Sequence, residues 1–205
     1  MLKISLSILA LIILVIGGAG IYHIHKVKAE SKAEMATYEK AVPVIADLGN
    51  VLVVYYSFSG HTKAIAEQIA QKTNADLFEI KTVKEYDKSY MTCIEEAKAE
   101  LRSNARPELA RYLDNLDGFD NIVIAGPCWW GTYPMAVFTQ LEKLDFTGKK
   151  VFPVMTHEGS GIAGATDALK KYCKGAAVGA GLAVHGADAA SSKNTVEKWA
   201  KENLL

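Results

Sequence analysis

The chain has 205 residues, enough for one domain of ordinary size with a further segment attached. Half of its residues are hydrophobic, and its 23 basic side chains equal its 23 acidic ones, so the composition supports a large core and lacks the basic excess of nucleic-acid-binding proteins. Its three cysteines are widely spaced, without a CxxC pair or a cysteine and histidine cluster. We therefore expect no disulfide framework, no metal and no nucleic acid among its ligands.

An apolar segment opens the chain. Residues 4–24 are apolar apart from two serines, a tyrosine and a histidine, and no charge occurs between Lys3 and Lys26. Because about 20 helical residues cross a bilayer core, residues 1–25 are predicted to form a single transmembrane anchor. A cleavable signal peptide is the alternative, since small residues at 17–20 offer a cleavage site, although the apolar part of a signal usually runs for only about 7–15 residues.

The flanks of the apolar segment bear on its orientation. More lysines follow it than precede it, and under the positive-inside rule this favours a cytoplasmic domain. An ordinary signal-anchor would place the domain outside, so the sidedness of this predicted single-pass protein stays open. Residues 26–49 mix Lys, Glu and Ala and are expected to be a linker, which leaves residues 50–205 as the folded domain.

A hydroxyl-rich turn at residues 57–62 stands between a predicted strand and a predicted helix. Residues 51–56 are an unbroken β-branched and aromatic run, typical of a strand covered on both faces in a parallel sheet, and apolar residues four apart follow from Ile65. The turn brings unpaired N–H groups and the positive end of a helix dipole to one point, which suits a phosphate. The residues expected there are Ser57, Ser59, Gly60, His61 and Thr62.

This turn has two other interpretations. No lysine follows the glycine as a nucleoside-triphosphate P-loop requires, and GxGxxG is absent, so a monophosphate fits better than a longer phosphate chain. The remaining alternative is a capped helix start that binds nothing, because Ser and Thr are ordinary N-cap residues. His61 could likewise lie beside the phosphate or face solvent.

Strand and helix patterns alternate along the rest of the domain. Further strands are expected at 75–80, 121–125, 150–155 and 178–184, the last of them diluted by glycine, and a helical pattern follows each one. Five such alternations predict an α/β domain with a doubly wound five-stranded parallel sheet and helices on both faces. Ligands of such sheets bind beyond the carboxyl ends of the strands.

Three loops together carry a resemblance to a known family. Ser-x-Ser-Gly-His-Thr after the first strand, Pro-x-Trp-Trp-Gly-x-x-Pro at 127–134 and Thr-His-Glu-Gly-Ser-Gly at 156–161 resemble the loops of short-chain, flavodoxin-like FMN-binding proteins. The resemblance covers residues 51 to about 200. It implies the strand order 2-1-3-4-5, in which these loops meet in one crevice, and FMN as the cofactor. The third loop departs from the family's pattern because Glu158 replaces a glycine.

The resemblance implies that the second and third loops hold the flavin ring. One or both of the adjacent indoles of Trp129 and Trp130 would stack on the ring, unless both pack beneath the loop. Glu158 would point to solvent or else face the ring and lower its reduction potential, and His157 would donate a proton or cap the next helix. The residues expected to contact the cofactor from these loops are Pro127, Cys128, Trp129, Trp130, Gly131, Thr156, His157, Glu158, Gly159 and Ser160.

No Ser-His-Asp set or carboxylate pair is visible by local spacing, so the chemistry should belong to the cofactor. The resemblance implies a membrane-tethered FMN protein that transfers electrons or acts as a small oxidoreductase. Its partners would be a redox protein, NAD(P)H or a quinone. The alternative is a binding or scaffold module of the same fold that has lost FMN, which Glu158 alone favours.

Overall fold

The computed structural model describes residues 51–87 and 89–205. The predicted anchor and linker, residues 1–49, lie outside this part of the chain. None of the helices in the described part has the length and the apolar character that crossing a bilayer requires.

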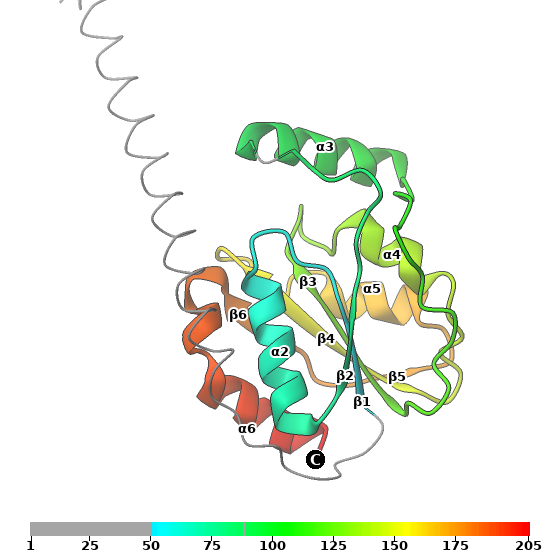
Figure 1. Cartoon of the computed structure of the whole chain (residues 1–205), viewed down its shortest axis with the longest axis vertical. Helices are drawn as coiled ribbons and strands as arrows, with labels where there is room; N and C mark the ends of the chain where they lie inside the picture. The colour runs from blue at the N-terminus through cyan, green and yellow to red at the C-terminus, as the bar shows by residue number, and fades with distance from the viewer. Residues whose placement is uncertain (1–50, 88) are drawn as a thin grey trace, which may run out of the picture. The chain divides into compact units, whose positions relative to one another are not determined.

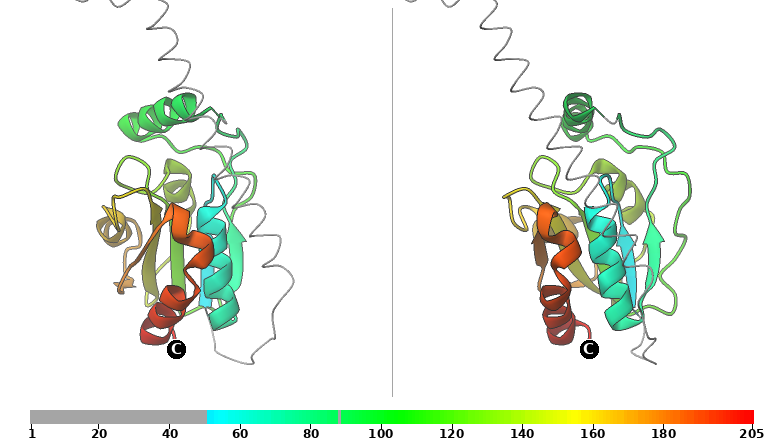
Figure 2. Two further views of the ribbon diagram at one scale, coloured as in Figure 1. Left: turned by 90° about the vertical axis from the view of Figure 1, so that its left-hand side faces the viewer. Right: turned by 60° about the vertical axis from the view of Figure 1, so that its left-hand side comes forward.

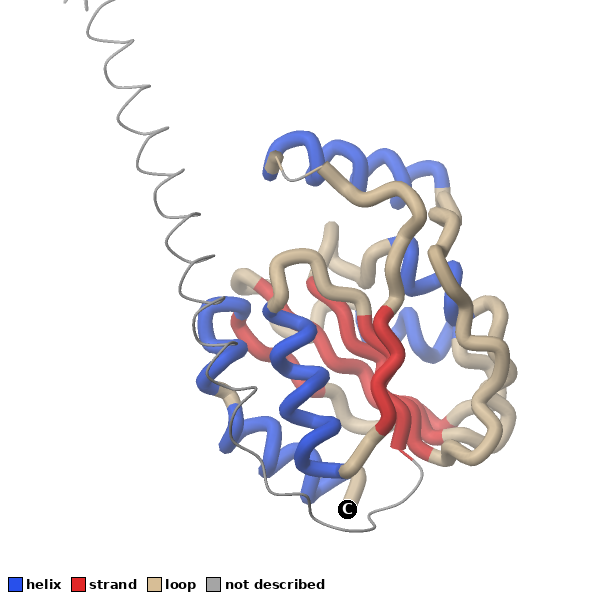
Figure 3. Tube along the Cα trace, viewed as in Figure 1, coloured by secondary structure: helices blue, strands red, loops and turns tan. Residues whose placement is uncertain are grey.

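A parallel sheet forms the centre of the domain (Figure 1), and the tube drawing separates its strands from the surrounding helices (Figure 3). The strands follow the order β2-β1-β3-β4-β5, with β6 also paired to β4, so the predicted order 2-1-3-4-5 is confirmed. The strands are β1 (Val51–Tyr55), β2 (Asp76–Glu79), β3 (Asn121–Pro127), β4 (Lys150–His157), β5 (Ala177–Val178) and β6 (Leu182–His185).

The predicted fifth strand is in fact two short ones. β5 pairs with the first residues of β4 and β6 pairs with its last ones. Residues 179–181 between them belong to neither strand, although the Gly179 amide still donates to the Val151 carbonyl over 2.9 Å. Gly179 packs directly against the Phe152 ring, where a Cβ would overlap the aromatic carbons. The prediction of one continuous strand over 178–184 was therefore wrong, because glycine at this point serves close packing and interrupts the pairing.

Helices cover both faces of the sheet (Figure 2), which confirms the doubly wound arrangement. α2 and α6 pack on one face, and α4 and α5 pack on the other. Side chains of a strand alternate between faces, so Val53 meets Ile65 of α2 on one side while Val54 faces the opposite core. The helices are α2 (His61–Thr73), α3 (Tyr90–Ser103), α4 (Met135–Leu141), α5 (Ala165–Tyr172), α6 (Lys193–Asn203) and the 3₁₀ helix η1 (Gly186–Ser191).

The helix α3 has a different position from the other α-helices of residues 51–205. In every view it stands beyond the carboxyl ends of the strands instead of lying flat on a face (Figures 1 and 2). Only Cys93 and Ala97 of this helix are buried, and Tyr90 at its start is 67% exposed. α3 therefore stands over the end of the sheet at which ligands of parallel α/β proteins bind.

Candidate cofactor site

The loops that follow β1, β3 and β4 meet at the carboxyl end of the sheet, as predicted. The hydroxyl groups of Thr62 and Thr156 are 2.7 Å apart and join the first loop to the third. The amide of Cys128 donates to the carbonyl of Thr156 over 2.7 Å and joins the second loop to the third. Three segments far apart in the sequence are thus held together by direct hydrogen bonds.

The first loop ends at Gly60, the N-cap of α2, whose φ of 96° favours glycine. The hydroxyl of Ser57 accepts a hydrogen bond of 3.1 Å from the Lys63 amide, so Ser57 caps the helix as the alternative interpretation supposed. Among the residues that the structure describes, no group accepts a hydrogen bond from the amides of His61 and Thr62. Two amides at the positive end of α2 therefore stay available for an anion.

The other two hydroxyls of the first loop differ in accessibility. Ser59 is exposed at the tip of the turn, whereas Thr62 is buried and faces Thr156. Because a hydroxyl accepts as well as donates, Thr62 can accept a hydrogen bond from Thr156 and still donate its own proton to an anion. The arrangement suits one phosphate group held by amides and hydroxyls.

The tandem tryptophans form a tight turn. The backbones of Trp129 and Thr132 exchange two hydrogen bonds of 2.9 and 3.1 Å, and the two central residues, Trp130 and Gly131, have φ values of 53° and 80°. Left-handed conformation at both central positions is the pattern of a type I′ turn, which Asn or Gly usually occupies. A tryptophan there costs about 1–3 kcal/mol in strain, which is typical of residues kept for function.

The two indoles occupy different environments. Trp130 is 47% exposed, its indole N–H donates to the Ile94 carbonyl of α3 over 3.2 Å, and the Lys98 ammonium lies 4.7 Å from its ring centre. Trp129 is half-buried and meets the rings of Tyr56 and Tyr86 edge to face at 5.7 and 5.0 Å. Trp129 therefore packs beneath the loop, whereas Trp130 does not, and Trp130 is the indole that can offer a face to a ligand.

Sequence reasoning missed the aromatic side chains around Trp129. Tyr56 lies at the end of β1, Phe58 lies in the first loop and is 41% exposed, and Tyr86 comes from the connection before α3. The Tyr86 hydroxyl donates to the Glu100 carboxylate of α3 over 2.6 Å, and burial raises the pKa of Glu100. Tyr56 directly precedes the turn at residues 57–62 and Phe58 lies within it, so their place in the sequence pointed to the site. Nothing in the sequence around Tyr86 or Glu100 pointed to it.

The third loop is buried at its start and exposed at its tip. Thr156 is buried, while Glu158, Gly159 and Ser160 are exposed. Nδ1 of His157 accepts a hydrogen bond of 2.9 Å from the Gly159 amide, so His157 shapes the loop and does not cap α5. Across the crevice, Pro127 and Cys128 are half-buried at the end of β3.

The Glu158 side chain is 73% exposed, so it points largely to solvent, which is one of the two orientations expected from the sequence. Its carboxylate is 3.5 Å from Nε2 of His185, at the end of β6, and it lies close to His61 at the start of α2. His185 was missed because the sequence pattern around it is that of an ordinary strand end. Within the described residues, no three histidine, cysteine or carboxylate side chains are placed to hold a metal ion.

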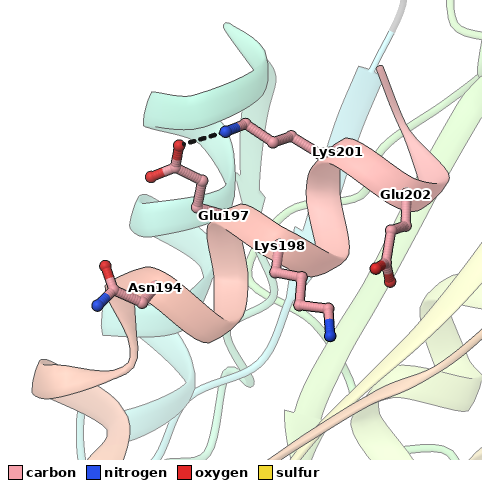
Figure 4. A pocket seen from close by; sticks show the side chains of 5 residues that line it. All are labelled: Asn194, Glu197, Lys198, Lys201 and Glu202. Carbon is pink, nitrogen blue, oxygen red and sulfur yellow. Dashed lines mark ion pairs between the residues drawn. The ribbon is translucent and has the colours of Figure 1, made fainter.

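A shallow groove on α6 lies apart from these loops (Figure 4). It has a volume of about 460 Å³ and is lined by charged and amide side chains of α6 alone. In the figure, Lys201 and Glu197 form an ion pair at 2.9 Å along this helix. The groove shares no residue with the three loops.

Comparison with known proteins decides the family. The sequence model of the flavodoxin family matches residues 50–203. The chain belongs to the flavodoxin family. No curated protein matches it. This flavodoxin is 32% identical to a candidate flavoprotein from Bacteroides uniformis, with a TM-score of 0.67, over 75% of this chain and 98% of the other.

Two further solved structures share the fold of this flavodoxin. A candidate flavoprotein from Bacteroides eggerthii is 23% identical, with a TM-score of 0.67, over 77% of this chain and 99% of the other. A flavoprotein from Lactobacillus acidophilus, solved in complex with FMN, is 23% identical, with a TM-score of 0.57, over 72% of this chain and 97% of the other.

Proposed function

We propose that this flavodoxin binds FMN across its three loops and transfers electrons through it. The observation that carries the proposal is the hydrogen bond between Thr62 and Thr156, which joins an amide-rich helix start to the loop beside the tryptophan turn. The family supports the same cofactor, and the Lactobacillus acidophilus flavoprotein that shares the fold was solved with FMN.

The side chains present fit such a cofactor. The amides of His61 and Thr62 and the hydroxyls of Thr62 and Ser59 would hold the phosphate, which needs no cationic side chain when helix-end amides face it. The exposed indole of Trp130 would lie against the flavin ring, while Trp129 supports the turn from below. Gly131, next to Trp130 in the turn, adds no side chain of its own beside the flavin ring.

FMN, when bound, supplies the electron transfer, so the chain itself has to position it and control access to it. Trp130 is fixed from two sides, by the carbonyl of Ile94 and by the ammonium of Lys98, both from α3. This indole, held by α3, would orient the ring. The remaining exposed edge, next to Phe58 and the tip of the third loop, would be the route by which electrons enter and leave.

Two kinds of electron donor and acceptor are compatible with an exposed flavin edge. A carrier would pass electrons to a redox partner protein, whereas a small oxidoreductase would admit NAD(P)H or a quinone over the ring. The apolar segment at residues 4–24 would tether the domain to a membrane, with the lysines after it favouring the cytoplasmic side.

The test uses the purified full-length chain. Titration with FMN should quench the flavin fluorescence, and the complex should be yellow. A colourless protein that leaves FMN fluorescence unchanged would favour the alternative of a scaffold module and would end the redox proposal. With FMN bound, oxidation of NADH or NADPH in the presence of a quinone would identify a reductase, and its absence alongside electron exchange with a redox protein would identify a carrier.

A further inference from the structure

A cluster of three histidines and one carboxylate lies beside the first loop. The His157 and His185 backbones pair in register at the ends of β4 and β6, and their rings are 5.7 Å apart. The Glu158 carboxylate reaches Nε2 of His185 at 3.5 Å. His61 comes to the same place from the start of α2, since its imidazole and the Glu158 carboxylate both approach Gly186.

The position of Gly186 shows how tightly these groups converge. A Cβ at this residue would overlap the Glu158 carboxylate and would lie 2.6 Å from Nδ1 of His61. Real Cβ atoms do not make such contacts, so glycine at 186 leaves room for the imidazole and the carboxylate to lie close together. His61 is therefore half-buried against the cluster and does not face solvent freely.

The hydrogen bonds within the cluster identify the imidazole that is free to gain a proton. Nδ1 of His157 accepts from the Gly159 amide at 2.9 Å, and Nδ1 of His185 accepts from the Ala187 amide at 3.3 Å. Each of these rings already uses one nitrogen as an acceptor, so protonation there would break a hydrogen bond. Among the described residues, neither ring nitrogen of His61 has a hydrogen-bond partner, and His61 can be protonated without such a loss.

The other charged groups on the neighbouring elements do not balance Glu158. Lys63, two residues after His61 on α2, is 3.6 Å from Glu67 of the same helix. η1, which packs against α2, contributes the exposed Asp188 and therefore adds negative charge. A phosphate at the start of α2 would bring up to two more negative charges close to Glu158. A proton on His61 would offset part of this added negative charge.

We propose that His61 takes up a proton when a phosphorylated flavin binds, so that its imidazolium lies between the phosphate and the Glu158 carboxylate. This rests on the proposed function, which places the phosphate at the start of α2. The proton comes from solvent, and no other bond is made or broken. Nε2 of His185 lies 3.5 Å from the same carboxylate and is the other imidazole beside it. Binding of the phosphorylated flavin then depends on pH. Binding of riboflavin, which has no phosphate, would not.

The electrostatics of the cluster agree with an uptake of this kind. Burial lowers the pKa of His61 below its ordinary value, and His185 lowers it further against the opposing effect of Glu158. His61 is therefore neutral near pH 7 while the phosphate is absent. A dianion beside the ring stabilises the imidazolium and raises this pKa, which is the condition for proton uptake on binding.

The test is the association constant for FMN at pH 7 and pH 8, measured by fluorescence quenching on the full-length chain. The free phosphate is almost fully ionised above pH 7, because its second pKa is about 6, so its own titration adds little. Wild type should bind FMN several-fold more weakly at pH 8, with a limit of about tenfold per pH unit for one proton. His61→Gln should give equal constants at the two pH values, while the matched control His157→Gln should keep the pH dependence.

A second measurement keeps the proposal testable if His61→Gln does not fold. Calorimetry of FMN binding to wild type at pH 7.2, in two buffers with different ionisation enthalpies, counts the protons taken up. Net uptake of a large part of one proton supports the proposal. Equal constants at pH 7 and 8, no net uptake, or an unchanged pH dependence in a folded His61→Gln variant would each overturn it. Failure of wild type to bind FMN at any pH would overturn the proposed function as well, and is recognised by the absence of quenching.

Discussion

The hydrogen bond between Thr62 and Thr156 gives the sharpest prediction. Both side chains are buried, at 2% and 4% exposure, and their hydroxyl oxygens are 2.7 Å apart. Thr62→Val removes one hydroxyl at nearly constant volume and leaves that of Thr156 buried without its partner. A stranded buried hydroxyl costs about 1–3 kcal/mol, so the free energy of unfolding should fall by that amount.

The same substitution should weaken FMN binding by a separate mechanism. If Thr62 donates to the phosphate, the bond is charge-assisted and is worth about 1.5–3 kcal/mol. At about 1.4 kcal/mol per factor of ten, the dissociation constant should rise roughly 10- to 100-fold. The double variant, with Thr156→Val added, removes both hydroxyls and should regain most of the lost stability, because no polar group is left stranded. It should not regain the affinity.

The assay combines urea unfolding with fluorescence titration for wild type, the two single variants and the double variant. Thr156→Val alone should lose stability but keep most of its FMN affinity, since Thr62 retains the proton that it donates. Should the double variant bind FMN as tightly as wild type, Thr62 would not contact the phosphate. If the double variant loses as much stability as the two single variants together, the claim that the two hydroxyls are each other's hydrogen-bond partner would be contradicted.

Three further substitutions probe other parts of the account. Gly126→Ala would place a Cβ 2.7 Å from the buried Tyr133 ring, so it should cost about 1–3 kcal/mol by urea unfolding, and a variant as stable as wild type would show that this ring can move. Trp130→Asn suits the left-handed turn and should leave stability within about 1 kcal/mol of wild type while weakening FMN binding; unchanged binding would exclude Trp130 from the site. Glu100→Gln removes a carboxylate whose pKa is raised by burial, so the folded state holds its proton more tightly than the unfolded state does and wild type loses stability as the pH rises through that range. Relative to the Glu100→Gln variant, wild type should therefore lose stability as the pH rises above the ordinary glutamate pKa of 4.5, and a stability difference that does not change with pH would refute this cause.

Much of the fold was predictable because its signals are local. Val53 and Val54 of β1 face two different cores, so every residue of this strand is apolar. Such an uninterrupted apolar run is typical of a strand with helices on both faces of its sheet. The carboxyl ends of neighbouring parallel strands meet at one edge, so the convergence of the three loops followed from the strand order. The division of the last strand did not follow, because it depends on Gly179 packing against Phe152 from another strand.

The details of the site depended on contacts between distant segments. Nothing in the sequence around Trp129 and Trp130 separates the indole that packs on Tyr86 from the one held by α3. The position of α3 depends in part on the hydrogen bond between Tyr86, in the connection before the helix, and Glu100, within it, and a helical pattern alone does not reveal such a contact. His185 joins the site through its register with β4, which is a tertiary property. Sequence reasoning found the loops, and packing decided which side chains face the crevice.

The central claim is that three loops hold one FMN molecule, and the position of that molecule tests it most directly. A crystal structure of the full-length chain with FMN should place the phosphorus atom within hydrogen-bonding distance of the His61 and Thr62 amides, with the flavin ring against Trp130. A phosphate at any other place, or a ring that touches neither indole, would contradict the account.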